Sequence, residues 1–417
     1  MCSSDLLRGL KNVGFLRFCC PGTTHQITYV SSVKKSRRYI ASLPGFSPEQ
    51  WILHKYDDQD ILNFRAFTNR IVLTFATLHY KRPKMKKNIA LLTGGYSGEY
   101  EISVKSGKVI EKHLDKDLFR VFPLIIGKQQ WIYKDTGGSE IPVNLNDFSL
   151  ELQEGKIKFD AAFIGIHGTP GEDGKLQGYL DMIGIPYNTC GRATSALTFN
   201  KFFCNEFVGR AGIKIANTVY LHKRDTPDTD TILSVTGLPC FVKPNSNGSS
   251  VGISKVHSRE ELLPAIQLAF ESDEEVLVQE FIPGVEITCG IYEKNGEPVI
   301  LPLTEIISHK EFFDFEAKYS GFSDEITPAR LPDNLTDECR SISLMLYRRL
   351  NCRGVVRFDY ILTPDQAPGG KQFYFLEVNT IPGLSEASIV PQQAAHMGIS
   401  LNRLFTDLLT ETLERYR

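Results

Sequence analysis

The chain has 417 residues, which at roughly 100 to 200 residues per domain predicts two to four domains. Hydrophobic residues make up 42% and charged residues 23%, values that disfavour wholesale disorder, collagen-like repeats and a disulfide scaffold. The net charge of -2 gives no reason to expect a nucleic acid or an anionic membrane as partner. The nine cysteines include no CxxC pair, so reduced thiols in a cytoplasmic protein are the simplest interpretation.

Residues 1–84 differ from the rest in charge, with 13 Lys and Arg against 5 Asp and Glu. They lack a sustained helical or strand period, so we expect a poorly structured extension. Its longest apolar stretch, residues 71–78, is far shorter than the ~20 residues that span a bilayer. An upstream reading-frame extension, with Met85 as the true start, is the preferred interpretation and a basic tail the second. Five acids disfavour a transit peptide.

Strands and helices alternate after Met85, which predicts an α/β layer structure with a parallel sheet. An apolar run ends in Gly94-Gly95 and precedes a helical pattern, so the first unit is a strand, a glycine turn and a helix. The elements expected in this part are strands at 88–93, 119–126 and 160–166 and helices at 99–114 and 176–183.

The remainder is predicted to be richer in strands. Ser258 and Glu261 have the spacing of a capping box at the start of a helix that runs to about residue 270. A polar break is expected at 225–230, and the apolar spacing at 401–413 predicts a packed amphipathic helix. The other elements expected are helices at 198–209 and 333–350 and strands at 239–243, 275–280, 286–292, 299–303, 355–362 and 372–378.

The strongest nucleotide signal is KPNSNGSSVG at residues 243–252, where a strand delivers Lys243 into a loop of glycines and serines. Such a loop presents backbone N–H groups to phosphate oxygens, and the lysine adds a positive charge. It matches neither the Walker pattern nor the dinucleotide pattern. Taken by itself, a flexible surface turn remains the alternative.

A second constellation is Arg357-Phe358-Asp359 followed by Glu377-Val378-Asn379. If the two lie on neighbouring strands, alternate residues point to one face and four polar groups share a patch. Two carboxylates and an amide oxygen are hard ligands suited to Mg²⁺, and the arginine can bind an anionic group. A solvated sheet face is the alternative for either strand alone.

Two weaker signals complete the set. Residues 276–280 (VLVQE) precede a Pro-Gly turn and Glu286, and the two glutamates could serve an adenine and ribose pocket or lie on an ordinary strand. Residues 167–174 (HGTPGEDG) follow an apolar strand at the edge where α/β sheets place ligands. We expect this loop to line a substrate site, with Glu172 or Asp173 as loop and helix-cap residues.

Together these motifs resemble the D-alanine:D-alanine ligase family of the ATP-grasp superfamily. The resemblance spans residues 85–417 and leaves residues 1–84 uncovered. It is carried by GGYSGEYEIS (94–103), HGTPGEDG (167–174), KPNSNGSSVGISKV (243–256), EFIPGVEIT (280–288), FFDFEAKY (312–319), RFDY (357–360) and LEVNTIPGLSEASIVP (376–391).

The resemblance implies a three-domain ATP-grasp ligase of α/β and α+β class. The expected divisions are an N-terminal parallel α/β substrate domain at 85–198, a central ATP-grasp subdomain at 199–282 and a C-terminal ATP-grasp and metal-binding domain at 283–417, after the extension at 1–84. It also implies ATP-dependent, ADP-forming joining of two D-alanine molecules through an acyl phosphate, for peptidoglycan precursor synthesis in the cytoplasm. A homodimer formed through the N-terminal domain is expected, without nucleic acid or membrane.

Nucleotide and metal residues follow from the matching positions. ATP phosphates would contact Lys201 and Lys243 under a loop containing Ser249 and Ser250. Adenine would lie at Glu280, Phe281 and Ile282, with the ribose at Glu286. Two Mg²⁺ ions, which Mn²⁺ can replace, would bind Asp359, Glu377 and Asn379. The family usually has Glu where this chain has Asn247, so contacts of that loop position do not carry over.

Substrate residues follow in the same way. Glu99 would hold the first ammonium, with His167 nearby, and Arg357 and the Gly383 N–H would stabilise the tetrahedral oxyanion. Ser388 and Ile389 would hold the second substrate. Lys318 and Tyr319 would lie in a mobile lid at 305–330 that excludes water. The catalytic set is thus Glu99, Ser249, Tyr319, Arg357 and Gly383.

Alternatives stay open for the activity and for the group that accepts a proton. Tyr319 favours the peptide-forming type, but a D-alanine:D-lactate ligase or another ATP-grasp carboxylate-amine ligase keeps the same fold. A nucleotide-binding regulatory module would lack metal ligands or oxyanion donors, which are all present here. The group that accepts the proton of the attacking amine is Tyr319, Ser249 or an oxygen of the substrates.

Overall fold

The computed structural model describes residues 27–29, 39–41, 86–135, 137–246, 252–308 and 323–416. The chain divides into two compact units, residues 1–84 and 85–417. In the first unit, β1 (Ile27–Tyr29) pairs antiparallel with β2 (Tyr39–Ala41). The rest of residues 1–84 lies outside the described ranges, so the expectation of a poorly structured extension stays a prediction.

The second unit begins with a five-stranded sheet in the order β6-β5-β4-β3-β9. β3 (Lys87–Gly94) lies between β4 (Phe119–Ile126) and β9 (Ala161–Ile164) and is parallel to both. β9 is buried along its whole length, as expected for a strand covered on both faces. The predicted parallel α/β layer is confirmed. Short antiparallel strands complete this part: β5 (Trp131–Lys134), β6 (Glu140–Pro142), and the hairpin of β7 (Ser149–Leu152) and β8 (Gly155–Lys158).

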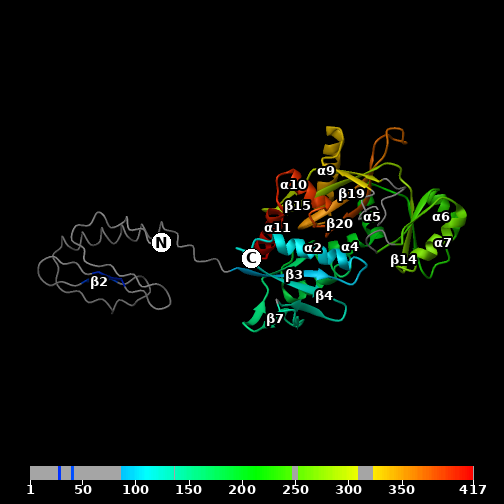
Figure 1. Ribbon diagram of the computed structural model, residues 1–417. Coiled ribbons are helices and arrows are strands. Elements are labelled where there is room, and N and C mark those ends of the chain that lie inside the picture. The colour runs from blue at the N-terminus through cyan, green and yellow to red at the C-terminus, as the bar shows by residue number, and fades with distance from the viewer. Residues whose placement is uncertain are drawn as a thin grey trace. The chain divides into compact units, whose positions relative to one another are not determined.

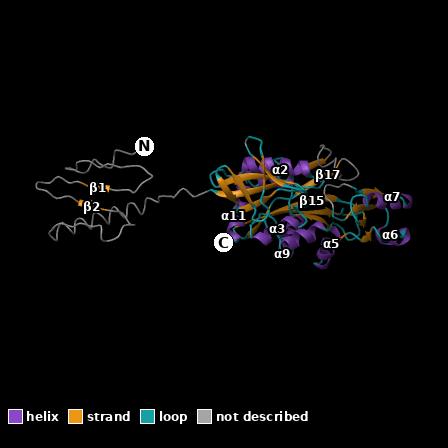
Figure 2. Ribbon diagram, turned by 90° about the horizontal axis from the view of Figure 1, so that it is seen from below, coloured by secondary structure: helices purple, strands orange, loops and turns teal. Residues whose placement is uncertain are grey.

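Four helices accompany this sheet and lead out of it. They are α2 (Tyr100–His113), α3 (Lys175–Ile183), α4 (Arg192–Phe199) and α5 (Lys201–Arg210). Figure 2 shows α2 and α3 on opposite sides of the strands. The predicted helix at 198–209 is wrong at its start, because Asn200 separates α4 from α5. The Asn200 side chain accepts the Phe203 N–H (2.9 Å) and so caps α5.

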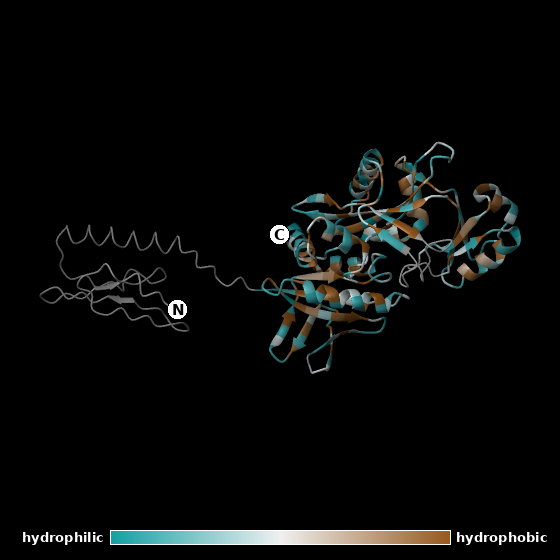
Figure 3. Cartoon of the chain, turned by 45° about the horizontal axis from the view of Figure 1, so that its top comes forward, coloured by the Kyte–Doolittle hydropathy of each residue, from teal (hydrophilic) through white to brown (hydrophobic). Residues whose placement is uncertain are grey.

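A second, antiparallel sheet has the order β11-β14-β12-β13 and lies beside α6 and α7 in Figure 1. Both helices pack on it through buried residues such as Ile232, Leu262 and Val278, and they show both hydrophobic and hydrophilic colours in Figure 3. Its elements are β11 (Thr218–His222), α6 (Thr229–Thr236), β12 (Cys240–Pro244), β13 (Ser254–Val256), α7 (Arg259–Ala269) and β14 (Glu275–Glu280).

The capping box predicted for α7 forms in altered shape. Ser258 is the N-cap, but its side chain makes no capping hydrogen bond. The Glu261 carboxylate instead accepts the backbone N–H of His257, one residue earlier (2.8 Å). This hydrogen bond lowers the pKa of Glu261. The helix start was therefore predicted correctly and the reciprocal side-chain bond was not.

The third sheet has seven strands in the order β10-β20-β19-β15-β17-β18, with β16 also paired to β15. Helix α9 (Asp333–Arg349) covers it through a core that includes Cys339, Leu346 and Phe358. The strands are β10 (Lys214–Ile215), β15 (Val285–Lys294), β16 (Glu297–Ile300), β17 (Thr304–Ser308), β18 (Ser323–Ile326), β19 (Val355–Leu362) and β20 (Phe373–Asn379).

The predicted lid at 305–330 is too wide at both ends. Its described ends form β17 and β18, which pair antiparallel within the third sheet. Glu305 is held in that sheet by a two-pronged ion pair with Arg330, at 2.9 and 3.0 Å. Residues 309–322, which include Lys318 and Tyr319, lie outside the described residues.

The C-terminal helices join the first sheet to the third. Helix α10 (Ile389–His396) precedes α11 (Leu401–Arg415), whose Leu404, Phe405 and Leu408 are fully buried. The Phe405 ring packs edge-on against Phe163 of β9, with 5.8 Å between ring centroids. The same core includes Leu91 of β3 and Tyr292 of β15. The packed terminal helix is thus confirmed. No helix among the described residues is long and apolar enough to cross a membrane.

One glycine marks a close approach that fixes this arrangement. Gly354 has φ +63°, and a Cβ there would lie 1.9 Å from the carbonyl oxygen of Asn188. We expect Gly354→Ala to lower the free energy of unfolding by more than about 2 kcal/mol, because it adds a clash to left-handed strain. Gly370→Ala, also at positive φ but facing open space, should cost only about 1 kcal/mol. Urea unfolding of both variants measures the difference, and equal losses would contradict this packing.

Candidate active site

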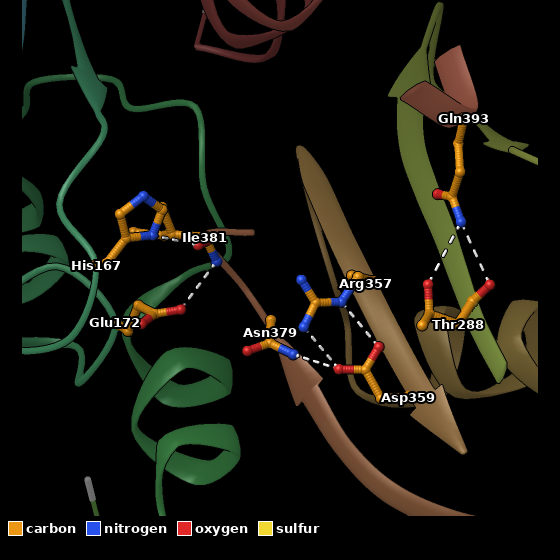
Figure 4. Close-up of polar contacts among 8 residues, drawn as sticks. All are labelled: His167, Glu172, Thr288, Arg357, Asp359, Asn379, Ile381 and Gln393. Carbon is orange, nitrogen blue, oxygen red and sulfur yellow. Dashed lines mark hydrogen bonds and ion pairs between the residues drawn. The ribbon is translucent and has the colours of Figure 1, made fainter. Parts of the chain in front are cut away.

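The paired strands β19 and β20 bring the predicted cluster together. Arg357 lies opposite Asn379 and Asp359 opposite Glu377 in the antiparallel register. Arg357 Nε and Nη2 donate to the two carboxylate oxygens of Asp359, both at 2.8 Å, and Asn379 Nδ2 donates to Asp359 Oδ2 at 2.9 Å (Figure 4). Asp359 is only 1% exposed, so this ion pair is shielded from water. The sequence prediction of one polar patch on neighbouring strands is confirmed.

The charge around Arg357 is strongly negative. Burial lowers the pKa of Arg357, but Asp359, Glu377 and Glu286 outweigh it and raise that pKa above its usual value. The guanidinium therefore stays charged at any working pH. Glu286 of β15, predicted as a ribose ligand, lies on the neighbouring strand and contributes to this field.

His167 follows β9 and contacts a distant part of the chain. One ring nitrogen, Nδ1, lies 2.9 Å from the carbonyl oxygen of Ile381, and Nε2 lies 3.0 Å from Ser106 Oγ (Figure 4 shows the Ile381 contact). Burial is the main effect that lowers the pKa of His167, so the ring is neutral. Because a carbonyl only accepts, Nδ1 carries the proton and Nε2 accepts from Ser106. Both ring nitrogens are thus used inside the protein.

Glu99 stands at the start of α2 and faces the same loop. A Cβ on Gly168, whose φ is +68°, would lie 2.7 Å from Ser97 Oγ and 3.1 Å from Glu99 Oε2. Glycine is therefore needed where the loop passes under the glutamate. The charges of Glu99 and Arg357 both act on His167. The predicted ammonium-binding residue and the predicted oxyanion residue therefore both lie within electrostatic reach of His167.

Glu172, predicted only as a loop or helix-cap residue, also reaches outside its loop to the backbone of Ile381. Its Oε2 accepts the Gly168 N–H at 2.7 Å and its Oε1 accepts the Ile381 N–H at 3.3 Å. Burial, and next the charge of Glu99, raise the pKa of Glu172 to about 8. The neighbouring Asp173 contacts the start of α3, because its carboxylate accepts the Lys175 N–H at 3.2 Å. Two adjacent acids in the glycine-rich loop between β9 and α3 were the available signal.

Two lysines from different elements lie within electrostatic reach of each other. Lys201 begins α5 and Lys243 lies in β12, and the residues between them include the whole of β11 and α6. Burial, and next the charge of Lys201, lower the pKa of Lys243 to about 8, while Glu377 opposes the shift. Asn245 fixes the pair by accepting the Lys201 N–H on its carbonyl (3.2 Å) and the Phe202 N–H on its side chain (2.9 Å). Ser249 and Ser250 lie outside the described residues.

The segment that joins the second sheet to the third contains the predicted adenine residues. Glu280 ends β14, and its Oε2 accepts the Asn217 N–H at 3.2 Å. The Phe281 ring lies beneath Lys255, whose Nζ is 4.4 Å from the ring centroid. Ile282 follows at partial exposure. The segment follows β14, which pairs with β12, so Glu280 lies opposite Cys240 and Lys243 lies opposite Leu277.

Gly383 and Ser388 lie together beyond β20. A Cβ on Gly383 would lie 2.7 Å from Ser388 Oγ and 3.1 Å from Ser388 Cβ, so the two residues are close neighbours. Ser388 also contacts Ser385 Oγ at 2.7 Å and precedes Ile389, the first residue of α10. Gln393 fixes α10 to β15 by donating to the carbonyl oxygen of Thr288 at 3.3 Å (Figure 4).

The donor set suits a hard divalent cation in chemistry. Among the residues that the structure describes, no cluster of three His, Cys, Asp or Glu could hold a metal ion. A metal here would therefore need the Asn379 amide as well as Asp359 and Glu377, a combination that Mg²⁺ accepts. In this structure the Arg357 guanidinium already donates one hydrogen bond to each Asp359 carboxylate oxygen.

The site combines two lysines near Glu377, a neutral histidine, and an arginine paired with Asp359. Such groups are suited to an enzyme that handles phosphates and an amino acid. Family models agree. The model described as D-ala D-ala ligase N-terminus matches residues 88–190, and the one described as D-ala D-ala ligase C-terminus matches residues 207–410. The chain belongs to the D-alanine:D-alanine ligase family.

Individual relatives cover almost four fifths of the chain. The D-alanine–D-alanine ligase of Porphyromonas gingivalis W83 is 45% identical over 331 residues, which are 79% of this chain and 99% of the relative. That of Flavobacterium johnsoniae is 46% identical over 327 residues, 78% of this chain and 99% of the relative.

Solved structures agree with the sequence relatives. D-alanyl-alanine synthetase A of Vibrio cholerae superposes with a TM-score of 0.71 at 30% identity, covering 79% of this chain and 99% of that one. The D-Ala:D-Ser ligase VanG of Enterococcus faecalis gives 0.69 at 31% identity, covering 78% and 99%. The Bacillus anthracis ligase complexed with ATP gives 0.61 at 28% identity, covering 79% and 97%.

Proposed function

We propose that this protein joins two D-alanine molecules to D-alanyl-D-alanine, with conversion of ATP to ADP and phosphate, to make a peptidoglycan precursor. One observation carries the proposal within this family. The β19–β20 register places Arg357 opposite Asn379 and Asp359 opposite Glu377. From there Arg357 acts on His167 of the loop after β9, and Glu377 acts on both Arg357 and Lys243.

The nucleotide end uses the convergent lysines. Lys201 and Lys243 bind the phosphates, with Ser249 and Ser250 closing over them, because two adjacent cations destabilise each other until an anion binds. The apolar and backbone groups of Glu280, Phe281 and Ile282 accept the adenine, and Glu286 the ribose. The Phe281 contact with Lys255 supports an ordered wall there.

Asp359, Glu377 and Asn379 would hold two Mg²⁺ ions, or Mn²⁺ in their place. When bound, these ions neutralise the repulsion between a carboxylate and the triphosphate. The chain's own contribution is to place the ligands on adjacent strands and to keep Arg357 charged beside them.

The chemistry then needs two transfers. A carboxylate oxygen of the first D-alanine attacks the γ-phosphorus, the bond to ADP breaks, and an acyl phosphate forms. The amine of the second D-alanine attacks that carbonyl, loses a proton, and expels phosphate. Glu99 orients the first ammonium by charge, with His167 nearby, and Arg357 and the Gly383 N–H stabilise the oxyanion between the two steps.

Ser388 and Ile389 are proposed to hold the carboxylate of the second D-alanine and its surroundings. The closeness of Ser388 to Gly383 supports this role, because a substrate held by Ser388 would lie beside the proposed oxyanion donor. Lys318 and Tyr319 are proposed to exclude water from the acyl phosphate, which would otherwise be hydrolysed.

The arrangement of the whole protein is proposed on the same basis. The three sheets support domains at 85–198, 199–282 and 283–417, with ATP bound between the last two. We propose a homodimer formed through the N-terminal domain and a place in the cytoplasm, where ATP and peptidoglycan precursors meet.

The test is turnover by the full chain with ATP, Mg²⁺ and a panel of acceptors. We expect one ADP and one dipeptide for every two D-alanine molecules consumed, and no ADP release above background with L-alanine. Competition with D-serine or D-lactate as the second substrate distinguishes related ligases. A ligase specific for one of these acceptors would form mainly the mixed product, D-alanyl-D-serine or D-alanyl-D-lactate. ADP release that does not depend on a D-amino acid would contradict the proposal.

The affinity for ATP should depend on pH through Lys243. Below about pH 7 the lysine is charged, because its pKa is about 8, and the dissociation constant should be constant. Above pH 8 the free protein loses this proton while the phosphates favour the charged form, so the dissociation constant should rise by up to about tenfold per pH unit. Calorimetric titration between pH 6.5 and 9.5 measures this. Lys243→Arg should flatten the curve, and a curve unchanged by that substitution would contradict the assignment.

A further inference from the structure

The N–H, the carbonyl and the side chain of Ile381 are each held by residues far from it in sequence. Its N–H donates to Glu172 Oε1 at 3.3 Å, and its carbonyl accepts from His167 Nδ1 at 2.9 Å. Its side chain is 3% exposed and packs in the core of the first sheet with Ile166 and Leu176. The residue that follows β20 of the third sheet by two positions is therefore anchored by the loop after β9 and by the core of the first sheet.

The anchored residue lies between two residues of the proposed site. Asn379 lies two residues before Ile381 and Gly383 two residues after it. Pro382 stands between, with a fixed φ and a restriction on the conformation of the residue before it. Because the connection is short and stiff, a displacement of the Ile381 backbone would also displace Asn379 and Gly383.

Glu172 also fixes the loop itself. Its second oxygen accepts the Gly168 N–H at 2.7 Å, and Gly168 passes directly beneath Glu99. One carboxyl group therefore connects the backbone under the ammonium-binding residue to the backbone beside the oxyanion donor. Figure 4 shows Glu172 and His167 reaching Ile381 from the same side.

We propose that Glu172 is a positioning residue for peptide-bond formation, which acts with His167 by clamping the Ile381 peptide and so sets the distance between the Gly383 N–H and the first substrate. This inference rests on the proposed ligase activity. The clamp acts on the alignment of the reacting groups, where a displacement of about 1 Å can cost about 10²-fold in rate. It does not act on nucleotide binding, which belongs to the lysine pair.

The kinetic test is a cycle of Glu172→Ala, His167→Ala and the double variant in the full chain. We expect each single variant to lower kcat by about 10- to 100-fold while KM for ATP stays within about twofold. The kcat of the double variant should be only slightly lower than that of the less active single variant, because either substitution already releases the backbone of Ile381. Glu172→Gln keeps one acceptor and should lose less than Glu172→Ala. Asp173→Asn, in the same loop but without a contact to Ile381 among the described residues, is the matched control and should retain kcat.

Hydrogen exchange gives a readout that needs no turnover. The amide of Ile381 should exchange at least about tenfold faster in Glu172→Ala than in wild type, and the Asp173→Asn variant should match wild type. Multiplicative losses in the double variant, a rise in KM for ATP parallel to the loss of kcat, or unchanged exchange would each overturn the clamp. A wild-type protein without D-alanine-dependent turnover would instead refute the proposed function, and the exchange result would still decide the clamp.

Discussion

Glu377→Gln should reduce D-alanine-dependent ADP release by about 10³-fold or more. The substitution keeps the size of the side chain but removes a charge that acts on Lys243, Arg357 and Glu172 alike. It also weakens one of the two carboxylate ligands proposed for the divalent ions, and such ligands contribute several kcal/mol to phosphoryl transfer.

Steady-state rates with saturating ATP measure this loss, and Mn²⁺ titration followed by electron paramagnetic resonance measures ion binding separately. Glu154→Gln is the matched control, because Glu154 is exposed in an ion pair with Arg120 on the outside of the first sheet. That variant should stay within about twofold of wild type, as surface ion pairs contribute little. Activity of Glu377→Gln within tenfold of wild type would rule out its part in catalysis.

Arg357→Lys is expected to lower dipeptide formation by about 10²- to 10³-fold, the range found when an oxyanion donor is removed. Lysine keeps the charge but cannot reproduce the fork that binds both oxygens of Asp359 at 2.8 Å. The buried carboxylate then loses one hydrogen bond, and the donor aimed at the tetrahedral oxyanion is displaced.

The ratio of dipeptide to ADP separates the two transfers. If Arg357 acts mainly at the second step, acyl phosphate that fails to meet the amine is hydrolysed, and the ratio should fall well below one. Arg120→Lys, which alters the exposed pair with Glu154, should keep the ratio at one. A ratio of one in Arg357→Lys, together with kcat within fivefold of wild type, would place Arg357 outside the reaction.

Much of the fold was predictable because its longer elements have clear periods. β4 and β19 were predicted with their observed bounds, since runs such as VVRFDYIL alternate apolar and polar side chains. Edge strands of two to four residues, such as β10 and β6, were missed because they are too short to show a period. The break at Asn200 was missed because two helices adjoin with a single residue between them.

The site was predictable where the chemistry is local in sequence. Arg357 and Asp359, or Glu377 and Asn379, stand two residues apart, so their common face follows from strand geometry. Glu172 was assigned to the loop because its partner Ile381 lies 209 residues away. Only the packing of Ile381 into the core of the first sheet brings the two together, and no local pattern encodes that contact.

The most direct measurement of the central claim follows one oxygen atom. D-alanine labelled with ¹⁸O in its carboxylate should transfer one labelled oxygen to inorganic phosphate for each dipeptide formed, because that oxygen attacks the γ-phosphorus and leaves with the phosphate. Mass spectrometry of the phosphate reads this out. Unlabelled phosphate from turnover that yields dipeptide would show that the carboxylate is never phosphorylated, and the proposed use of this site would be wrong.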